Sequence, residues 1–242
     1  MPTPRSALVT GANKGIGREI ARRLAGLGCL VWLGARDAAR GEEAAAALRA
    51  EGGDVRFLAI DVADSASVAR AAETLARAGD RLDILVNNAG IALDRGVAPS
   101  ALDLALLQAT YEVNVFGPVR VTQAFLPLLR AAPAARIVMM SSGLGSLGRT
   151  SDPAMPYYPT NLLAYNSSKS ALNAITVIFA KELRDTAIKV NAADPGYTAT
   201  DLNGHSGPRS VAQGAEIAVR LATLADDGPT GGFFNDEGPQ PW

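Results

Sequence analysis

Two residues of one segment, Tyr165 and Lys169, have the types and the spacing that proton transfer needs. They lie four residues apart in LLAYNSSKSALNAI, residues 162–175, so they would share one face of a helix. A tyrosine hydroxyl ordinarily has a pKa of about 10, and a nearby ammonium group favours the tyrosinate and brings that pKa toward neutrality. No other tyrosine of the chain is followed by a lysine four residues later. The pair alone also fits an ordinary amphipathic helix, so the rest of the chain must decide.

The composition excludes several other kinds of chemistry. The chain has one histidine, His205 in NGHSG, and one cysteine, Cys29, at the start of the apolar run CLVWLGA. A Ser-His-Asp triad elsewhere in the chain, an internal disulfide and a Cys/His metal site are therefore not expected, and Cys29 is expected to be a small buried residue. The net charge of −1 and the 5% aromatic content argue against binding to nucleic acid or to an anionic membrane.

The sequence contains no apolar run near the roughly 18 residues of a membrane span. Residues 1–6 form a short polar segment, unlike a secretory signal. We therefore expect a soluble, cytoplasmic protein.

Short apolar segments alternate with longer segments rich in alanine, leucine, arginine and glutamate. Runs such as ILV and IVMM lack polar alternation, which is typical of strands covered on both faces by helices. The repeated strand–helix order predicts one domain over residues 1–242, a doubly wound α/β fold with a parallel sheet of about seven strands and helices on both faces. The expected strands lie within residues 6–11, 29–35, 54–61, 82–90, 135–142, 188–196 and 231–236.

The segment TGANKGIG follows the first expected strand and begins the first expected helix. Ligands of a doubly wound sheet bind beyond the carboxyl ends of the strands. Glycines let the chain turn sharply and let a pyrophosphate approach the backbone, and a helix start offers free N–H groups. A glycine turn without a ligand is the alternative. The residues of the predicted phosphate-binding turn are Gly11, Asn13, Lys14, Gly15, Ile16 and Gly17.

Several motifs together, in their order and spacing, resemble the classical short-chain dehydrogenase/reductase family. The glycine turn is similar to its T-G-x-x-x-G-x-G pattern, and NNAG (residues 87–90), a serine after the fifth strand, Tyr-x-x-x-Lys and PGYTAT (residues 195–200) are similar to its further motifs. NKGIG, ARD and LVNNAGIA look most like the carbonyl-reductase-like members. The resemblance implies a Rossmann fold, a nicotinamide cofactor and a small carbonyl or alcohol substrate. It also implies cofactor contacts at Asp61, Val62, Asn88, Ala89, Gly90, Tyr165, Lys169, Pro195, Gly196, Thr198 and Thr200.

The end of the second strand reads GARD, with Arg36 before Asp37. An arginine at this place suits the 2′-phosphate of NADP(H), whereas an acidic residue suits the ribose hydroxyl of NAD. Lys14 can add a second positive charge toward a dianionic phosphate. We therefore expect NADP(H), with Asp37 as the evidence for NAD.

The resemblance implies a catalytic set of Asn114, Ser142, Tyr165 and Lys169. SSG leaves a choice between Ser141 and Ser142, and the glycine three residues after Ser142 favours the second, which would orient the substrate carbonyl. Pro118 lies in an apolar segment expected to be helical and frees the carbonyl four residues earlier, that of Asn114. That carbonyl could hold a water that links Lys169 to solvent; a simple helix kink is the alternative.

The segment between Ser142 and Tyr165 is enlarged relative to the shortest family members. Enlarged loops at a ligand-binding edge often shape substrate pockets, so Met155, Tyr157 and Tyr158 are expected to border substrate together with Ser142 and Tyr165. GYTATDLNGHSGP, residues 196–208, is expected to be a mobile lid.

The motifs predict an NADPH-dependent reductase of a ketone or aldehyde, or the reverse dehydrogenation, with Tyr165 as general acid/base. The alternatives are an NAD-dependent alcohol dehydrogenase of the same family and a non-catalytic NADP-binding regulator. A sugar-nucleotide epimerase or dehydratase would need more chain after Thr200. Many members of the family that the chain resembles form dimers or tetramers through the fourth long helix and the helix of Tyr165, where Ala164, Ser168 and Ala171 would permit close packing. A homodimer, a homotetramer and a monomer are the alternatives for this chain.

Overall fold

The computed structural model describes residues 4–79 and 81–242. Residues 1–3 and 80 lie outside the described part. Two predictions include some of these residues: the single domain over residues 1–242, and the short polar start that is unlike a secretory signal.

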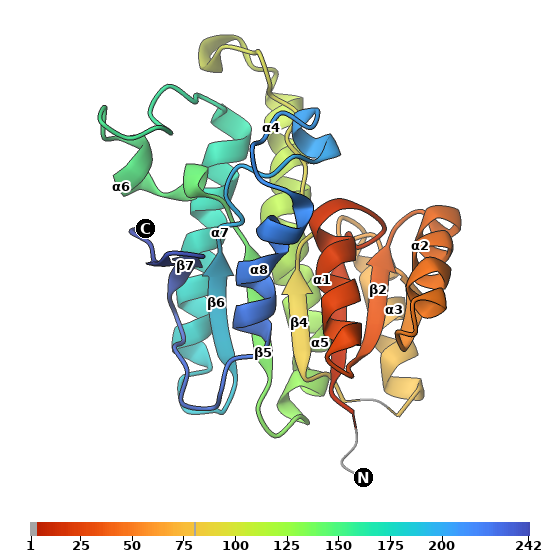
Figure 1. The fold of residues 1–242 in the computed structure, drawn as a ribbon. Coiled ribbons are helices and arrows are strands. Elements are labelled where there is room, and N and C mark those ends of the chain that lie inside the picture. The colour runs from red at the N-terminus through yellow and green to blue at the C-terminus, as the bar shows by residue number, and fades with distance from the viewer. Residues whose placement is uncertain (1–3, 80) are drawn as a thin grey trace.

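A twisted central sheet has the strand order β3-β2-β1-β4-β5-β6-β7-β8 (Figure 1). Its neighbouring strands are parallel except β7 and β8, which are antiparallel. The predicted doubly wound α/β fold is therefore confirmed. The two-residue β8 was not predicted, because glycine and proline carry no strand signal. The strands are β1 (Ser6–Thr10), β2 (Leu30–Ala35), β3 (Val55–Ala59), β4 (Ile84–Asn87), β5 (Arg136–Met140), β6 (Lys189–Ala193), β7 (Phe233–Asn235) and β8 (Gly238–Pro239).

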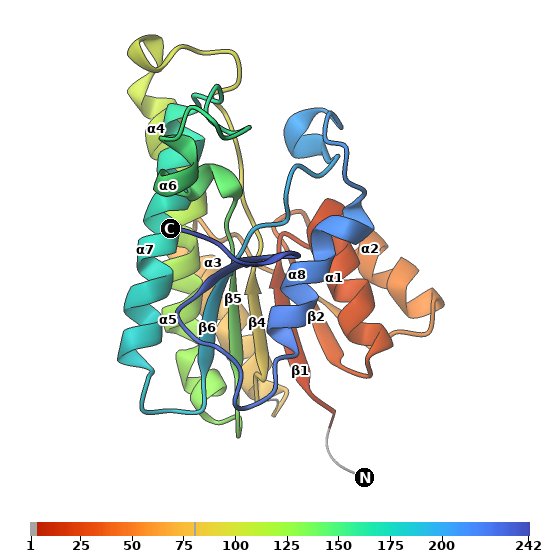
Figure 2. The same cartoon turned by 60° about the vertical axis from the view of Figure 1, so that its left-hand side comes forward.

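Helices cover both faces of the sheet, as Figure 2 shows from the side. One face carries α1 (Gly15–Gly26), α2 (Ala38–Ala50) and α8 (Val211–Ala222), and the other carries α3 (Ser65–Arg77), α5 (Gly117–Arg130) and α7 (Leu163–Glu182). Alternate residues of β1 to β6 enter opposite cores, as expected for strands covered on both sides. In β1, Ala7 and Val9 enter the first core and Leu8 enters the second. Among the described residues, no helix combines the length and the apolarity that crossing a bilayer requires.

The remaining helices lie near the carboxyl ends of the strands. They are α4 (Leu104–Tyr111), α6 (Leu147–Thr150) and the 3₁₀ turns η1 (Pro99–Ala101), η3 (Gly143–Gly145) and η4 (Asp201–Asn203). The π-helical turn η2 (Glu112–Phe116) joins α4 to α5 and lies directly before Pro118. There the N–H of Gly117 bonds to the carbonyl of Glu112, five residues earlier. The predicted disturbance by Pro118 is thus a π-helical bulge rather than a simple kink.

The chain reverses its strand order beside β1. It runs outward from β1 through β2 to β3 and then crosses to β4 on the other side of β1. In open α/β sheets the crevice at such a reversal is the usual ligand site. The fold therefore brings the segments after β1, β4, β5 and β6 to one edge, which is the upper end of the molecule in Figure 1.

Candidate active site

The glycine turn after β1 has the backbone that a phosphate-binding turn requires. Gly11 and Gly15 have φ angles of 63° and 57°, in the left-handed region that favours glycine. A Cβ atom on Gly17 would lie 2.4 Å from Nδ2 of Asn88, so no side chain fits there. Helix α1 begins after Lys14 without a side-chain cap, so no side chain occupies its first N–H groups. These features fit the binding of a dinucleotide pyrophosphate.

A cleft at the carboxyl edge brings together most of the residues predicted to contact the cofactor. Its lining also includes Ala35, Ile60, Ile91, Val113, Met140, Ser141, Asp201 and Leu202, which were not predicted as cofactor contacts. Gly196 and Thr198 were predicted but lie outside the lining, and the hydroxyl of buried Thr198 donates to the carbonyl of Pro195 at 3.0 Å. The predicted residues in the lining are Gly11, Asn13, Lys14, Gly15, Ile16, Gly17, Arg36, Asp61, Val62, Asn88, Ala89, Gly90, Tyr165, Lys169, Pro195 and Thr200.

The two basic residues predicted for a 2′-phosphate differ in their surroundings. Arg36 lines the cleft and makes no hydrogen bond or ion pair with any other residue of the described chain. Lys14 also lines the cleft, but its Nζ lies 2.5 Å from Oδ2 of Asp201. Asp37 caps α2, where its Oδ1 accepts the N–H of Arg40 at 3.1 Å, and it is not part of the cleft lining. Arg36 is therefore available to an anion, whereas the carboxylate of Asp37 is engaged elsewhere.

Helix α7 places Tyr165 and Lys169 together, one turn apart. The Nζ of Lys169 lies 5.6 Å from the centroid of the Tyr165 ring and donates to the carbonyl of Met140, at the end of β5, at 2.8 Å. Lys169 is only 4% exposed. Burial lowers the pKa of its ammonium group to about 8.

The pKa of Tyr165 moves opposite to the expected direction. Burial raises the pKa of this phenol to about 12, and a hydrogen bond with the side chain of Ser142 opposes the rise. The ammonium of Lys169 lies over the ring and donates to the carbonyl of Met140, and burial is the largest cause of the shift of the phenol's pKa. Tyr165 is therefore held protonated, which is the form a proton donor needs.

The structure separates the two candidate serines. The hydroxyl of Ser141 is buried and donates to Oδ1 of Asn173 on α7 at 2.6 Å. The side chain of Ser142 lowers the pKa of the Tyr165 phenol and so lies beside it, and its Oγ accepts the N–H of Leu144 at 3.2 Å. Ser142 is thus the serine beside the phenol, as the sequence predicted.

Asn114 lies in the π-helical turn and links three segments through its side chain. Its Nδ2 donates to the carbonyl of Ile91 at 2.9 Å and to Oγ of Ser168 at 3.0 Å, and its Oδ1 accepts the N–H of Ile91 at 2.9 Å. Ser168 in turn donates to the carbonyl of Tyr165 at 2.7 Å. The contacts that the structure shows are therefore those of the side chain, and the predicted water at the Asn114 carbonyl stays a prediction.

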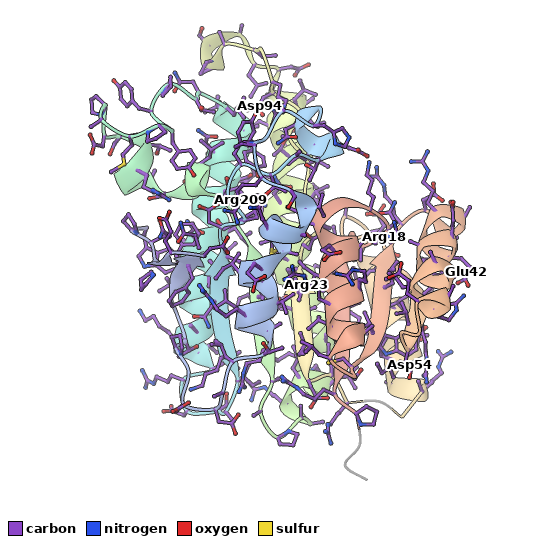
Figure 3. The ribbon with its side chains drawn as sticks, viewed as in Figure 1. Arg18, Arg23, Glu42, Asp54, Asp94 and Arg209 are labelled. Carbon is purple, nitrogen blue, oxygen red and sulfur yellow. The ribbon has the colours of Figure 1, made fainter. Side chains whose placement is uncertain are left out.

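Asp94, which the sequence analysis missed, fixes the start of α7. It lies at the upper end of the molecule (Figure 3) and is 1% exposed. Its Oδ2 accepts the N–H groups of Ala164 at 2.7 Å and of Tyr165 at 3.3 Å. Leu162, the residue before α7, offers no side-chain cap. A helix without a local cap residue was the only signal that could have suggested a distant acceptor.

A second missed carboxylate, Asp194, lies between two loops of the site. It is 3% exposed, and burial raises its pKa. Its Oδ1 accepts the N–H of Gly196 at 2.9 Å, and a Cβ atom on Gly143 would lie 3.0 Å from its Oδ2. It therefore connects the segment after Ser142 to the segment after β6. A lone acid after an apolar strand was the signal in the sequence.

Of the predicted substrate residues, Tyr165 lines the cofactor cleft, whereas Ser142, Met155, Tyr157 and Tyr158 lie outside its lining. Tyr157 is half-buried, with the guanidinium of Arg149 5.0 Å from the centroid of its ring, and it lies close to Gly143, next to Ser142. Met155 and Tyr158 are 38% and 47% exposed. His205, in the segment predicted as a lid, pairs with Asp201 at 2.8 Å. Of Met155, Tyr157 and Tyr158, only Tyr157 thus packs against the loop of Ser142.

The proposed dimer contacts on α7 need a correction. Ala164 and Ser168 are fully buried within the chain, and Ser168 is bonded to Asn114. Neither side chain can face a partner helix. Periodicity cannot distinguish a small residue packed inside the chain from one on an outer face, and Ala171 alone of the three is partly exposed.

The comparisons with known proteins bear on this geometry. The family model described as short chain dehydrogenase matches residues 5–210. The chain belongs to this family. The family is one of oxidoreductases, and the carbonyl-reductase-like resemblance is confirmed.

Three relatives illustrate the similarity. (-)-Isopiperitenone reductase of Mentha piperita is 34% identical over 95% of this chain and 96% of its own length. Carbonyl reductase [NADPH] 1 of Sus scrofa is 33% identical over 98% and 94%. The crystal structure of NADPH-bound carbonyl reductase from chicken fatty liver superposes with a TM-score of 0.86 at 29% identity and covers 99% of each chain.

Proposed function

We propose that the protein is an NADPH-dependent reductase that converts a ketone or aldehyde into an alcohol and can run the reverse reaction. The observation that carries the proposal is the position of Tyr165, beside Ser142 and Lys169, at the edge of a cleft that the glycine turn also lines. The names of the relatives support the same activity, since they include a carbonyl reductase of pig named with NADPH.

Each side chain has a role that follows from its contacts. The Ser142 hydroxyl, beside Tyr165, would hold the substrate carbonyl oxygen, and the protonated Tyr165 would donate to the oxygen as negative charge develops on it. Lys169 lies over the ring of Tyr165 and lines the cleft, where its ammonium would hold the nicotinamide ribose. Asn114 would keep α7 aligned through Ser168.

NADP(H) is the proposed cofactor, and it supplies the hydride when bound. The glycine turn and the uncapped start of α1 would hold its pyrophosphate. Arg36, which has no partner within the described chain, would bind the 2′-phosphate. Asp61 and Val62 would contact the adenine, and Asn88, Ala89 and Gly90 the adenosine ribose.

The test is a panel of ketones and aldehydes assayed with NADPH and NADH on the natural protein and on Tyr165→Phe. Loss of the proton donor should lower kcat by about 10²- to 10⁴-fold. NADPH binding, followed by fluorescence, should change little, because phenylalanine keeps the ring beside Lys169.

Tyr111→Phe is the matched control, since that tyrosine lies at the end of α4, outside the cleft lining, and has no lysine one turn later. Its kcat should stay within about twofold of the natural value, as expected for a surface substitution. If Tyr165→Phe keeps most of the rate, the proton-donor assignment is wrong. If NADPH binds but no carbonyl compound of the panel is reduced, the proposed reductase function is wrong and a non-catalytic regulator is the alternative.

A further inference from the structure

An ion pair joins the two sides of the cofactor cleft. Nζ of Lys14, in the glycine turn after β1, lies 2.5 Å from Oδ2 of Asp201, in the segment after β6. The two residues are 187 positions apart in the sequence, and both line the cleft. Lys14 is also one of the two basic side chains proposed for the 2′-phosphate. The pair therefore occupies a group that the cofactor would use.

The segment around Asp201 is ordered by its own hydrogen bonds. Thr200 and Asn203 cap the short turn η4 reciprocally, and Nδ2 of Asn203 donates to the carbonyl of Thr198 at 2.7 Å. Arg95, from the segment after β4, donates to the carbonyl of Leu202 at 3.1 Å. These bonds hold the Asp201 backbone over the cleft, so the carboxylate is presented to Lys14 from a fixed position.

Asp201 should be ionised wherever the enzyme is assayed near neutral pH. The hydrogen bond from Lys14 is the main cause that holds the pKa of the Asp201 carboxyl below its ordinary value, and His205 acts in the same direction. A dianionic phosphate and this carboxylate would compete for one ammonium group. The ribose hydroxyl of NAD(H) carries no charge and meets no such competition.

We infer that Asp201 limits the preference of this protein for NADP(H), because it competes with the 2′-phosphate of NADP(H) for Lys14. The inference rests on the proposed NADP(H) site and adds a residue that opposes NADP(H) within it. Arg36, free of such a partner, then supplies most of the preference for the phosphate. Binding of NADP(H) also releases the segment of Asp201 from the glycine turn, whereas binding of NAD(H) leaves the two joined.

The expected effect is modest, because both side chains are more than half exposed. Replacing Asp201 by asparagine keeps the size of the side chain and removes the charge. The Kd for NADPH should fall by about two- to fivefold in Asp201→Asn, the range typical of an exposed ion pair. The Kd for NADH should not change by more than the error of the measurement.

The experiment measures the Kd of NADPH and of NADH by nucleotide fluorescence, without substrate, on four proteins. These are the natural protein, Asp201→Asn, Lys14→Met and the double variant. In the Lys14→Met background, the Asp201 substitution should have no effect on the Kd for NADPH, because the ammonium group for which the carboxylate and the phosphate compete is absent. This cycle isolates the coupling between the two residues.

Asp227→Asn is the matched control. Asp227 is exposed in the loop before β7, at the opposite edge of the sheet, and the substitution removes the same charge. It should leave both Kd values unchanged. If it tightens NADPH binding as much as Asp201→Asn does, the effect is one of net charge and the inference is wrong.

Two further outcomes overturn the inference. One is an unchanged or weaker Kd for NADPH in Asp201→Asn. The other is an equal gain in the presence and absence of Lys14. If the natural protein binds NADH more tightly than NADPH, the proposal of NADP(H) as the cofactor is wrong instead. The Asp201 inference is then still judged by its own NADPH measurements, so the two failures are distinguishable.

Discussion

Lys169 carries an ammonium group into the interior of the protein. Its Nζ has one hydrogen bond, to the carbonyl of Met140, and burial lowers its pKa from the ordinary 10.5 to about 8. A lysine whose pKa is lower in the folded state destabilises the fold while it is protonated. This cost is fully present below pH 8 and disappears as pH rises toward the pKa of the unfolded chain. The residue is therefore placed for its role at the site and at a cost in stability.

Lys169→Met should separate stability from activity. The variant keeps an unbranched side chain, removes the buried charge and leaves the Met140 carbonyl without a donor, so the free energy of unfolding at pH 7 should rise by about 1–3 kcal/mol. The difference from the natural protein should shrink by about 1.4 kcal/mol per pH unit above pH 8. Carbonyl reduction should fall by at least about 100-fold. Urea unfolding at pH 7 and pH 9.5, together with kcat, measures both effects.

The control for this prediction is Lys181→Met. Lys181 lies on the same helix and faces solvent. Its substitution should leave kcat and the pH dependence of unfolding unchanged. Equal pH profiles for the natural protein and Lys169→Met would contradict the lowered pKa of Lys169.

At the scale of one element, the start of α7 depends on a carboxylate from another loop. Asp94 accepts the N–H of Tyr165 itself and so fixes the first turn that carries the phenol. Its charge also lies at the positive end of a 20-residue helix. Ser168 and Asn114 hold the same turn through the Tyr165 carbonyl. Asp94 is thus a positioning residue, which acts on the reaction through Tyr165.

Asp94→Ala should lower the free energy of unfolding by about 1–2 kcal/mol, as the loss of an N-cap does. It should also lower kcat by about tenfold or more, because small displacements of a catalytic group are costly. Asp94→Asn keeps an oxygen acceptor for the two N–H groups and should recover most of kcat. Chemical denaturation and steady-state kinetics on both variants check the expectation.

Asp103→Ala is the matched control for the cap. Asp103 caps α4 by accepting the N–H of Ala105 at 2.8 Å. Its loss should reduce stability without changing kcat. If Asp94→Ala and Asp103→Ala affect kcat equally, Asp94 has no positioning role.

The elements show how far local sequence patterns can predict this structure. Buried parallel strands lack polar alternation, so all seven parallel strands were placed to within a few residues, and Gly11 and Gly15 marked a turn that only glycine readily adopts. Asp94 was missed because the N–H groups that it accepts lie far along the chain, and Asp194 was missed because Gly143 lies in another loop. The raised pKa of Tyr165 was missed because desolvation depends on the finished packing, which spacing does not contain.

At the scale of the whole molecule, the cleft draws its lining from both halves of the sheet. Gly11 and Arg36 come from the half that contains β1 to β3, and Gly90, Lys169 and Pro195 from the half that begins with β4. A cofactor bound there contacts segments that meet only in the folded chain. Ligands that bind the folded state alone stabilise it by mass action.

The rise in the Tm of the protein on cofactor binding should therefore show which of the two nucleotides binds more tightly. NADPH at 100 times its Kd stabilises the folded state by about 2.7 kcal/mol, which corresponds to a rise in Tm of about 5–10 °C for a chain of this size. NADH at the same concentration should produce a smaller rise, and the difference measures the ratio of the two Kd values. Arg36→Met should reduce the NADPH shift to nearly that of NADH, since it removes the unpaired guanidinium. Arg184→Met, at the opposite edge of the sheet, should leave both shifts unchanged. Equal shifts with the two nucleotides on the natural protein would contradict the assignment of Arg36 to the 2′-phosphate.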